Sequence, residues 1–271
     1  MTMPQFPNSD QADGIWTLKK VRRAILGENW PVPPTVSAFW DETVLSIGTS
    51  STNSLNNSTF IDRSTDNRTM TVVSAPTQTA FHPYLDNWSV EFDGSGDYLS
   101  VNSIPAVGSG DYTIEFWMNG SDVETGTWQS LVSRDYANSD GFRLYKKTGV
   151  SELVFYNGSS ATATTVSAGL TNNTWHHIAV VRNSGTLDIY VDGVSKISVS
   201  NSSNISEAVK PINIGGNTGE VSSYPYTGYI SNLRLNIGNA LYTENFTPPS
   251  QKLTVSARQH YSPANPTVLS T

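Results

Sequence analysis

The sequence contains no cysteine, so disulfide bonds, thiolate metal sites and cysteine nucleophiles are all excluded. Charged residues are also scarce, at 14% of the 271 residues, and the net charge is −7. An acidic surface repels the phosphates of nucleic acids, so we expect no nucleic-acid partner. Ser, Thr, Asn and Gly supply most of the polarity instead, which is typical of short strands joined by tight turns.

Long apolar runs are missing as well. No stretch of the chain approaches the ~20 apolar residues that span a bilayer, so we expect no membrane insertion. Residues 1–14, MTMPQFPNSDQADG, lack a basic region followed by an apolar segment, and we therefore expect no secretory signal peptide. The sequence also has no phosphate loop, dinucleotide fingerprint or nucleophile elbow.

Residues 15–30, IWTLKKVRRAILGENW, differ from the rest of the chain because their apolar residues recur every three or four positions. This spacing predicts a short amphipathic helix, which Gly27 and the Pro-rich linker at 31–34 end. We therefore assign residues 1–35 to an N-terminal anchoring segment. The helix either folds back on the following domain with a solvated basic face or docks on an acidic neighbouring subunit. The candidate anchor residues are Trp16, Leu18, Lys19, Lys20, Val21, Arg22, Arg23, Ile25 and Trp30.

From about residue 36 the hydrophobic period changes to two, and short alternating segments are separated by turn residues. This pattern predicts an all-β, antiparallel β-sandwich over residues 36–250, followed by a C-terminal extension at 251–271. NSG at 183–185 predicts a tight hairpin between two of the strands. The alternating segments include NWSVEFDGSGDYLSV (87–101), DYTIEFWMN (111–119), ELVFYNG (152–158), WHHIAVVR (175–182), LDIYVDG (187–193) and YISNLRLN (229–236).

Two adjacent histidines, His176 and His177, are the obvious candidates for metal ligands or catalysis. Consecutive residues in a strand point to opposite faces, so these two imidazoles diverge and do not chelate one ion together. We interpret both as hydrogen-bonded strand residues.

Taken in order, the segments resemble the laminin-G-like, concanavalin A-like lectin/glucanase jelly rolls over residues about 43–250. The family's Trp-x-His-Val/Ile-Ala motif is matched by Trp175 to Ala179, and its Val-Asp/Asn-Gly strand end by Val191 to Gly193. The resemblance implies a jelly-roll sandwich. These positions recur in members with unrelated functions, so they indicate the fold and not an activity.

Many enzymes with this kind of sandwich are glycoside hydrolases, which need a positioned acid and base. Their Glu-x-Asp-x-x-Glu strand motif is approached only by Glu91 and Asp93, since Gly96 stands at the third position. Glu115 is alone in its strand, YTIEFWM. We therefore expect no catalytic residues and no enzyme activity, with a glycoside hydrolase as a less favoured alternative.

Some members of the family bind calcium at a rim of the sandwich. Asp62 and Asn67 lie where a loop cluster of oxygen ligands could form. Relatives often read Ile-Asp-Glu-Val-Arg in a late strand, whereas residues 230–234 read ISNLR and lack both carboxylates. Calcium thus stays an open alternative, and we expect no other cofactor.

Many members bind carbohydrate through loops at one end or on one face. The loops at 134–142 and 220–229 could supply aromatic rings for stacking and polar partners. Alternatively, their tyrosines pack against neighbouring loops or subunits. The candidate glycan-binding residues are Tyr136, Asn138, Asp140, Tyr224 and Tyr226.

The segments GIWTLKKVRRAILGENWP and LYTENFTPPS resemble a leader and an ending found in bacteriophage virion proteins that carry such sandwiches. The resemblance implies a non-enzymatic virion structural protein, such as a head decoration, head fibre or tail-fibre component. It would be made in the host cytoplasm, displayed on the particle exterior as a homo-oligomer, and attached to capsid or tail proteins through residues 1–35. The alternative is a carbohydrate-binding adhesin that recognises host-surface polysaccharide.

Overall fold

The computed structural model describes residues 43–48, 58–84, 89–124, 127–134, 140–147, 149–158, 160–165, 167–216 and 224–250. All regular secondary structure within these ranges is β-strand, which confirms the all-β prediction. The helix expected in residues 15–30 and the domain boundary at residue 35 lie outside the described residues. The strands are β1 (Thr43–Gly48), β2 (Ile61–Asp62), β3 (Met70–Val73), β4 (Thr77–Thr79), β5 (Ser89–Asp93), β6 (Tyr98–Val101), β7 (Tyr112–Gly120), β8 (Gln129–Arg134), β9 (Phe142–Lys146), β10 (Leu153–Asn157), β11 (Ser160–Thr164), β12 (His176–Asn183), β13 (Thr186–Val191), β14 (Val194–Ser200), β15 (Ile212–Ile214) and β16 (Thr227–Ile237).

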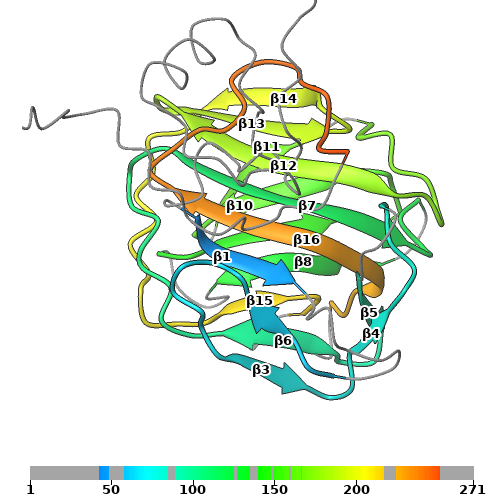
Figure 1. The fold of residues 1–271 in the computed structure, drawn as a ribbon. Helices are drawn as coiled ribbons and strands as arrows, with labels where there is room; N and C mark the ends of the chain where they lie inside the picture. The colour runs from blue at the N-terminus through cyan, green and yellow to red at the C-terminus, as the bar shows by residue number, and fades with distance from the viewer. Residues whose placement is uncertain are drawn as a thin grey trace, which may run out of the picture. The chain divides into compact units, whose positions relative to one another are not determined.

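The strands form two antiparallel sheets, one in front of the other in Figure 1. The nine-stranded sheet has the order β14-β13-β12-β7-β16-β1-β2, with β5 also paired to β16 and β4 to β5. The seven-stranded sheet has the order β11-β10-β9-β8-β15-β6-β3. Because β16 pairs with β1, β5 and β7, segments from both ends of the described chain meet in the nine-stranded sheet.

The core lies between the two sheets and follows the period of two. In β7, Ile114, Phe116 and Met118 point into the core. In β9 and β10 the inward positions include Leu144 and Phe155, both fully buried. Burying such side chains contributes roughly 1.5–3 kcal/mol each, so this alternation fixes which face of every strand meets the other sheet.

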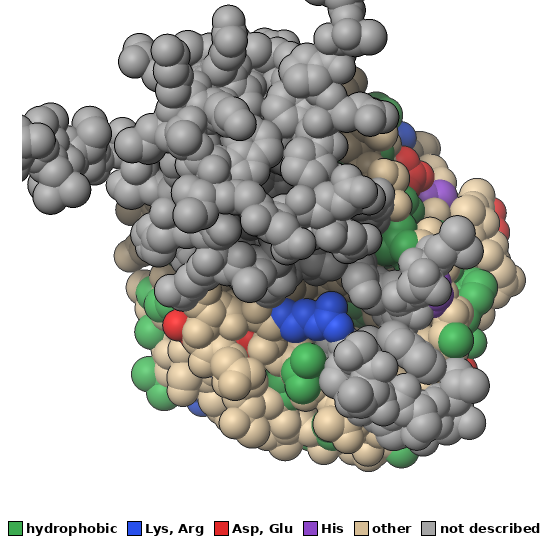
Figure 2. Space-filling view, in the orientation of Figure 1, with side chains coloured by type: hydrophobic (Ala, Val, Ile, Leu, Met, Phe, Trp, Pro, Cys, Tyr) green, Lys and Arg blue, Asp and Glu red, His purple; other side chains and the backbone are tan. Residues whose placement is uncertain are grey.

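Few charges interrupt the surface. On the face in Figure 2, the described part of the molecule is mostly uncharged polar side chains and backbone, with small and separate red and blue areas. This agrees with the low charged fraction of the sequence.

Residues 238–250 cross the outer face of the nine-stranded sheet, and we call this segment the strap. Tyr242 and Phe246 stack on each other with ring centroids 3.6 Å apart, and Phe246 also packs against His177 and Tyr190. The backbone N–H of Phe246 donates to the carbonyl of Gly193, 2.9 Å away. A Cβ on Gly193 would lie 1.8 Å from the Phe246 carbonyl oxygen, so only glycine allows this approach.

Candidate functional site

The outer face of the seven-stranded sheet carries a row of polar side chains. Strand register aligns one outward position from each of six neighbouring strands, and none of the six is a carboxylate. Most of the row is buried, with Ser133 and Asn213 having no exposed surface. The row, from β3 to β10, is Thr71, Ser100, Asn213, Ser133, Arg143 and Tyr156.

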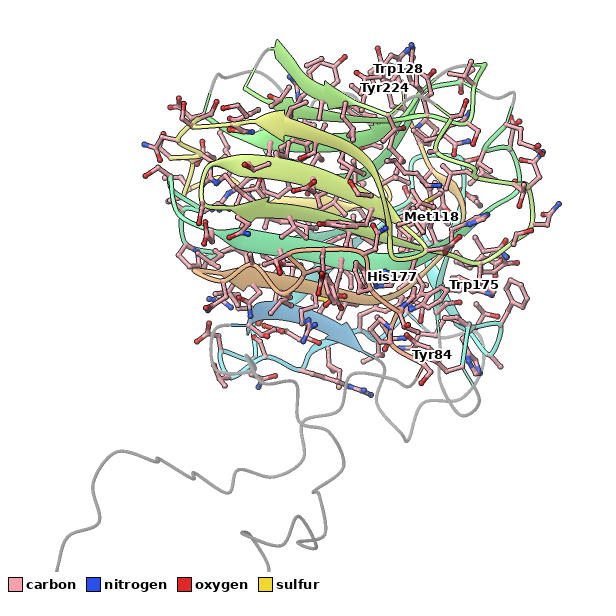
Figure 3. All side chains as sticks on the ribbon, turned by 90° about the horizontal axis from the view of Figure 1, so that it is seen from above. Tyr84, Met118, Trp128, Trp175, His177 and Tyr224 are labelled. Carbon is pink, nitrogen blue, oxygen red and sulfur yellow. The ribbon has the colours of Figure 1, made fainter. Side chains whose placement is uncertain are left out.

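Four aromatic rings lie together on this outer face, and we call them the aromatic platform: Trp128, Tyr145, Tyr156 and Tyr224. Tyr145 is the buried centre, with ring centroids 5.9 Å from Trp128, 5.8 Å from Tyr156 and 5.7 Å from Tyr224. The other three rings are partly exposed. Figure 3 shows Trp128 and Tyr224 side by side on this sheet, away from His177 on the other. The platform therefore offers partly accessible aromatic rings on this outer face.

Charged groups lie near the platform, and Arg143 packs against one of its rings. The guanidinium carbon of Arg143 lies 4.8 Å from the centre of the Tyr156 ring, within cation–π range, and Arg143 also donates to the carbonyl of Gly158. Lys147 and Glu152 form an ion pair of 3.0 Å beside the same strands. Tyr224 is fixed through its backbone carbonyl, which accepts the N–H of Ser130 at 2.9 Å.

The structure separates the candidate glycan residues. Tyr224 lies in the platform, whereas Tyr226 is fully buried in the core, which corrects its assignment as a surface residue that stacks on sugars. The N–H of Tyr226 donates to the Gly215 carbonyl at 3.1 Å, and this bond brings the residue between the sheets. Asp140 is exposed before the first residue of β9, about 17 Å from Tyr145 at ~3.3 Å per strand residue. Tyr136 and Asn138 lie outside the described residues.

Three of the platform residues were not among the candidates from the sequence: Trp128, Tyr145 and Tyr156. Strand alternation could have identified two of them, because Tyr145 and Tyr156 occupy the outward positions next to the inward Leu144 and Phe155.

Glu115 is the centre of a buried polar network on the outer face of the nine-stranded sheet. Its carboxylate forms an ion pair with Arg234 and accepts a hydrogen bond from the Tyr242 hydroxyl at 2.7 Å. Nε2 of His177 lies 3.2 Å from Oε2 of Glu115. Glu115 is the lone carboxylate of its strand, as the sequence indicated, and the partners that the sequence did not predict come from distant strands and from the strap.

The pKa of Glu115 reports this environment. Burial acts to raise the pKa, but the Arg234 charge and the hydrogen bonds from His177 and Tyr242 outweigh it and lower the pKa to about 2. Burial and the Glu115 charge raise the pKa of Tyr242 well above its usual range. The carboxylate thus stays ionised, and because Glu115 is only 1% exposed the network is placed to hold the strap and not to meet a ligand.

The two histidines diverge, as the strand alternation predicts. Nε2 of His176 accepts the backbone N–H of Thr171 at 3.1 Å, so its Nδ1 carries the proton and donates to Asp192, 2.7 Å away. His177 instead joins the Glu115 network on the opposite face. Each ring is therefore part of a separate hydrogen-bonded network.

The remaining sequence candidates have structural partners. Glu91 accepts the Tyr229 hydroxyl at 3.1 Å, and Asp93 accepts the N–H of Ser95 at 2.7 Å within a turn. The side chain of Asp62, where calcium was considered, accepts four hydrogen bonds, one from Ser46, two from Ser64 and one from Arg68.

Across the described ranges, no group of three or more histidine or acidic residues has a metal-binding arrangement. Within the same ranges no helix is long and apolar enough to cross a membrane. The anchor residues Trp16, Leu18, Lys19, Lys20, Val21, Arg22, Arg23, Ile25 and Trp30 all lie outside the described residues.

Two facing antiparallel sheets with the core between them define a β-sandwich. Residues 93–237 match the model of the concanavalin A-like lectin/glucanases superfamily. This match covers more than half of the chain, so the chain belongs to that superfamily. A comparison with curated protein sequences found no match.

Several solved structures share the fold. The receptor binding domain of botulinum neurotoxin D aligns with a TM-score of 0.55 at 15% identity over 78% of this chain and 51% of that one. The binding domain of Paraclostridial Mosquitocidal Protein 1 aligns with a TM-score of 0.56 at 19% identity, over 75% of this chain and 50% of that one. A third structure is domain 4 of AbnA, a GH43 extracellular arabinanase from Geobacillus stearothermophilus, solved in complex with arabinotriose. It aligns with a TM-score of 0.54 at 16% identity, over 73% of this chain and 93% of that one. This chain therefore spans about half the length of the toxin domains, and at these identities the likeness shows the fold.

Proposed function

We propose that this domain binds carbohydrate, and that the aromatic platform is the binding site. The observation that carries the proposal is the group of three partly exposed rings around the buried Tyr145. Aromatic faces pack against the C–H faces of sugar rings, while phenol and indole groups keep hydrogen bonds available for hydroxyls. The likeness to an arabinanase domain solved with arabinotriose supports this class of ligand.

We further propose that the domain binds without hydrolysing. A glycoside hydrolase needs two carboxyl groups at about 5–5.5 Å or about 6.5–9.5 Å across the scissile bond. The six positions of the polar row beside the platform include no carboxylate. Glu152, an acidic side chain next to these strands, is already paired with Lys147.

Isothermal titration of the full chain with arabinotriose, cellotriose, mannotriose and N-acetylchitotriose tests this proposal. Trp128→Ala and Tyr224→Ala should each weaken the interaction at least tenfold, because truncating a stacking ring at the centre of an interface removes more than about 1.4 kcal/mol. Val209→Ala is the matched control, since Val209 is 85% exposed near the opposite end of β8. Binding that survives both platform substitutions unchanged would contradict the proposal.

A second proposal concerns where the domain works. We propose that it is displayed on the exterior of a virion, in many copies, and that residues 1–35 attach it to capsid or tail proteins. The resemblance of residues 14–31 and 241–250 to segments of phage virion proteins supports this location. Display in many copies would also raise the avidity of weak glycan sites.

Peptide mass spectrometry and cryo-electron microscopy of purified particles test the virion proposal. We expect regular copies of the chain on the capsid or tail, with residues 15–30 at the contact. Absence of its peptides from purified particles would refute a virion role and leave the carbohydrate-binding proposal standing.

A further inference from the structure

A second group of aromatic side chains lies on the outer face of the nine-stranded sheet. Phe81, Trp175 and Tyr229 form a triangle with ring centroids 5.4 Å apart for Phe81–Trp175, 4.9 Å for Phe81–Tyr229 and 6.4 Å for Trp175–Tyr229. Phe81 is 45% exposed and is the one aromatic residue among the exposed large hydrophobics of the described chain. We call these three residues the aromatic triangle. An exposed aromatic group on a sheet face calls for an explanation other than core packing.

An oriented carboxylate adjoins the triangle. Strand register places Tyr229 of β16 opposite Glu91 of β5. The Tyr229 hydroxyl donates to one Glu91 oxygen at 3.1 Å, and the Thr77 hydroxyl lies 3.5 Å from the other. Glu91 is partly exposed, so its remaining lone pairs can accept hydrogen bonds from a ligand.

Two buried N–H donors beside the triangle have no hydrogen-bond partner. Asn119 lies opposite Tyr229 in the same strand register, is 2% exposed, and leaves its side-chain Nδ2 unpaired. Nε1 of Trp175 is also buried and unpaired. Each unmade bond costs about 1–3 kcal/mol, and most buried polar groups are paired. Two such donors at one aromatic group indicate partners supplied from outside the chain.

We propose that the aromatic triangle is a second saccharide-binding site, on the sheet opposite the platform, and that its ligand is a neutral sugar. Sugar hydroxyls can donate to Glu91 and accept from Asn119 and Trp175 in one bound pose, whereas a uronic or sulfated sugar would meet the Glu91 charge. Both N–H groups are buried in the free chain, so a bound sugar reaches them only after neighbouring side chains move. Figure 3 shows Trp175 and Trp128 well apart, beside different sheets. One protein molecule would therefore bind two separate glycan chains. This inference rests on the proposed carbohydrate-binding function.

Nitrogen-15 correlation NMR of the full chain gives a separate reporter for each site. The Trp175 indole and the Asn119 amide report the triangle, and the Trp128 indole reports the platform. During titration with arabinotriose, cellotriose, mannotriose and N-acetylchitotriose, we expect saturable shifts of both reporters with at least one sugar. Phe81→Ala should raise the dissociation constant read at Trp175 at least fivefold and leave the value read at Trp128 unchanged. Trp128→Ala should do the reverse, and Val209→Ala should change neither.

The outcomes separate the two proposals. If Trp128 shifts while Trp175 and Asn119 stay still with all four sugars, the triangle is not a site and the platform stands. Shifts at Trp175 that disappear in Trp128→Ala are transmitted from the platform and also overturn this inference. Shifts at Trp175 without any at Trp128 support the triangle and overturn the platform. If neither reporter moves with any of the four, both proposals fall.

Discussion

Replacing Glu115 by glutamine tests the buried network directly. The substitution keeps the shape of the side chain but leaves the Arg234 guanidinium, whose side chain is 4% exposed, without its counter-charge. Removing one partner of a buried ion pair costs about 3–5 kcal/mol. The pKa gives a consistent magnitude, because lowering it from 4.5 to about 2 stabilises the fold by about 3 kcal/mol at neutral pH. At about 2–4 °C per kcal/mol for domains of this size, Tm should fall by about 6–20 °C.

The pH dependence of unfolding adds a sharper readout for Glu115→Gln. Since folding lowers the pKa of Glu115, its contribution is complete above pH 4.5 and is lost as the pH falls toward about 2. The difference between wild type and Glu115→Gln in urea unfolding should therefore shrink from pH 5 to pH 2. Glu152→Gln is the matched control, because its pair with Lys147 is partly exposed and should contribute at most about 1 kcal/mol. A loss below 1 kcal/mol for Glu115→Gln, or one that is constant over this pH range, would refute the reasoning.

Three further predictions concern other parts of the chain. Arg182→Lys should lower urea stability by about 2 kcal/mol, because lysine cannot reproduce the guanidinium bonds to the carbonyls of Gly108, Gly110 and Ser203. Gly193→Ala should destabilise the fold by more than about 1 kcal/mol and speed hydrogen exchange in the strap, whereas Val194→Ala should do neither. The 271-residue chain should co-purify with particles. A chain starting at residue 36 should fold, as judged by circular dichroism, but should not attach to particles. Equal incorporation of both chains would contradict the anchoring role.

Local structure was predictable because local chemistry determines it. The alternation that turns Ile114 inward and Glu115 outward was readable from the sequence, and so was the hairpin at 183–185, where Ser184 and Gly185 both have positive φ. The sequence could not predict that Tyr224 is partly exposed and Tyr226 buried, because both precede β16 and strand alternation does not extend to them. Backbone bonds to Ser130 and Gly215, distant in the sequence, help to set their positions.

The long-range contacts were beyond the reach of sequence patterns. Glu115 and Arg234 are 119 residues apart, and no periodicity relates them. The aromatic platform likewise joins rings from four segments of the chain, so its composition follows only once the strand order of the sheet is known. A single sequence specifies which side chains face outward but not which of them become neighbours.

The position of β16 has a consequence for synthesis of the chain. This strand pairs with β1, β5 and β7, yet it is the last strand of the described chain to leave the ribosome. Until Ile237 has emerged, β1 and β5 lack the partner that joins them to β7, and their edges stay open to other nascent chains. The nine-stranded sheet therefore completes only after Ile237 has emerged, and a chain stopped before β16 should aggregate instead of folding in part.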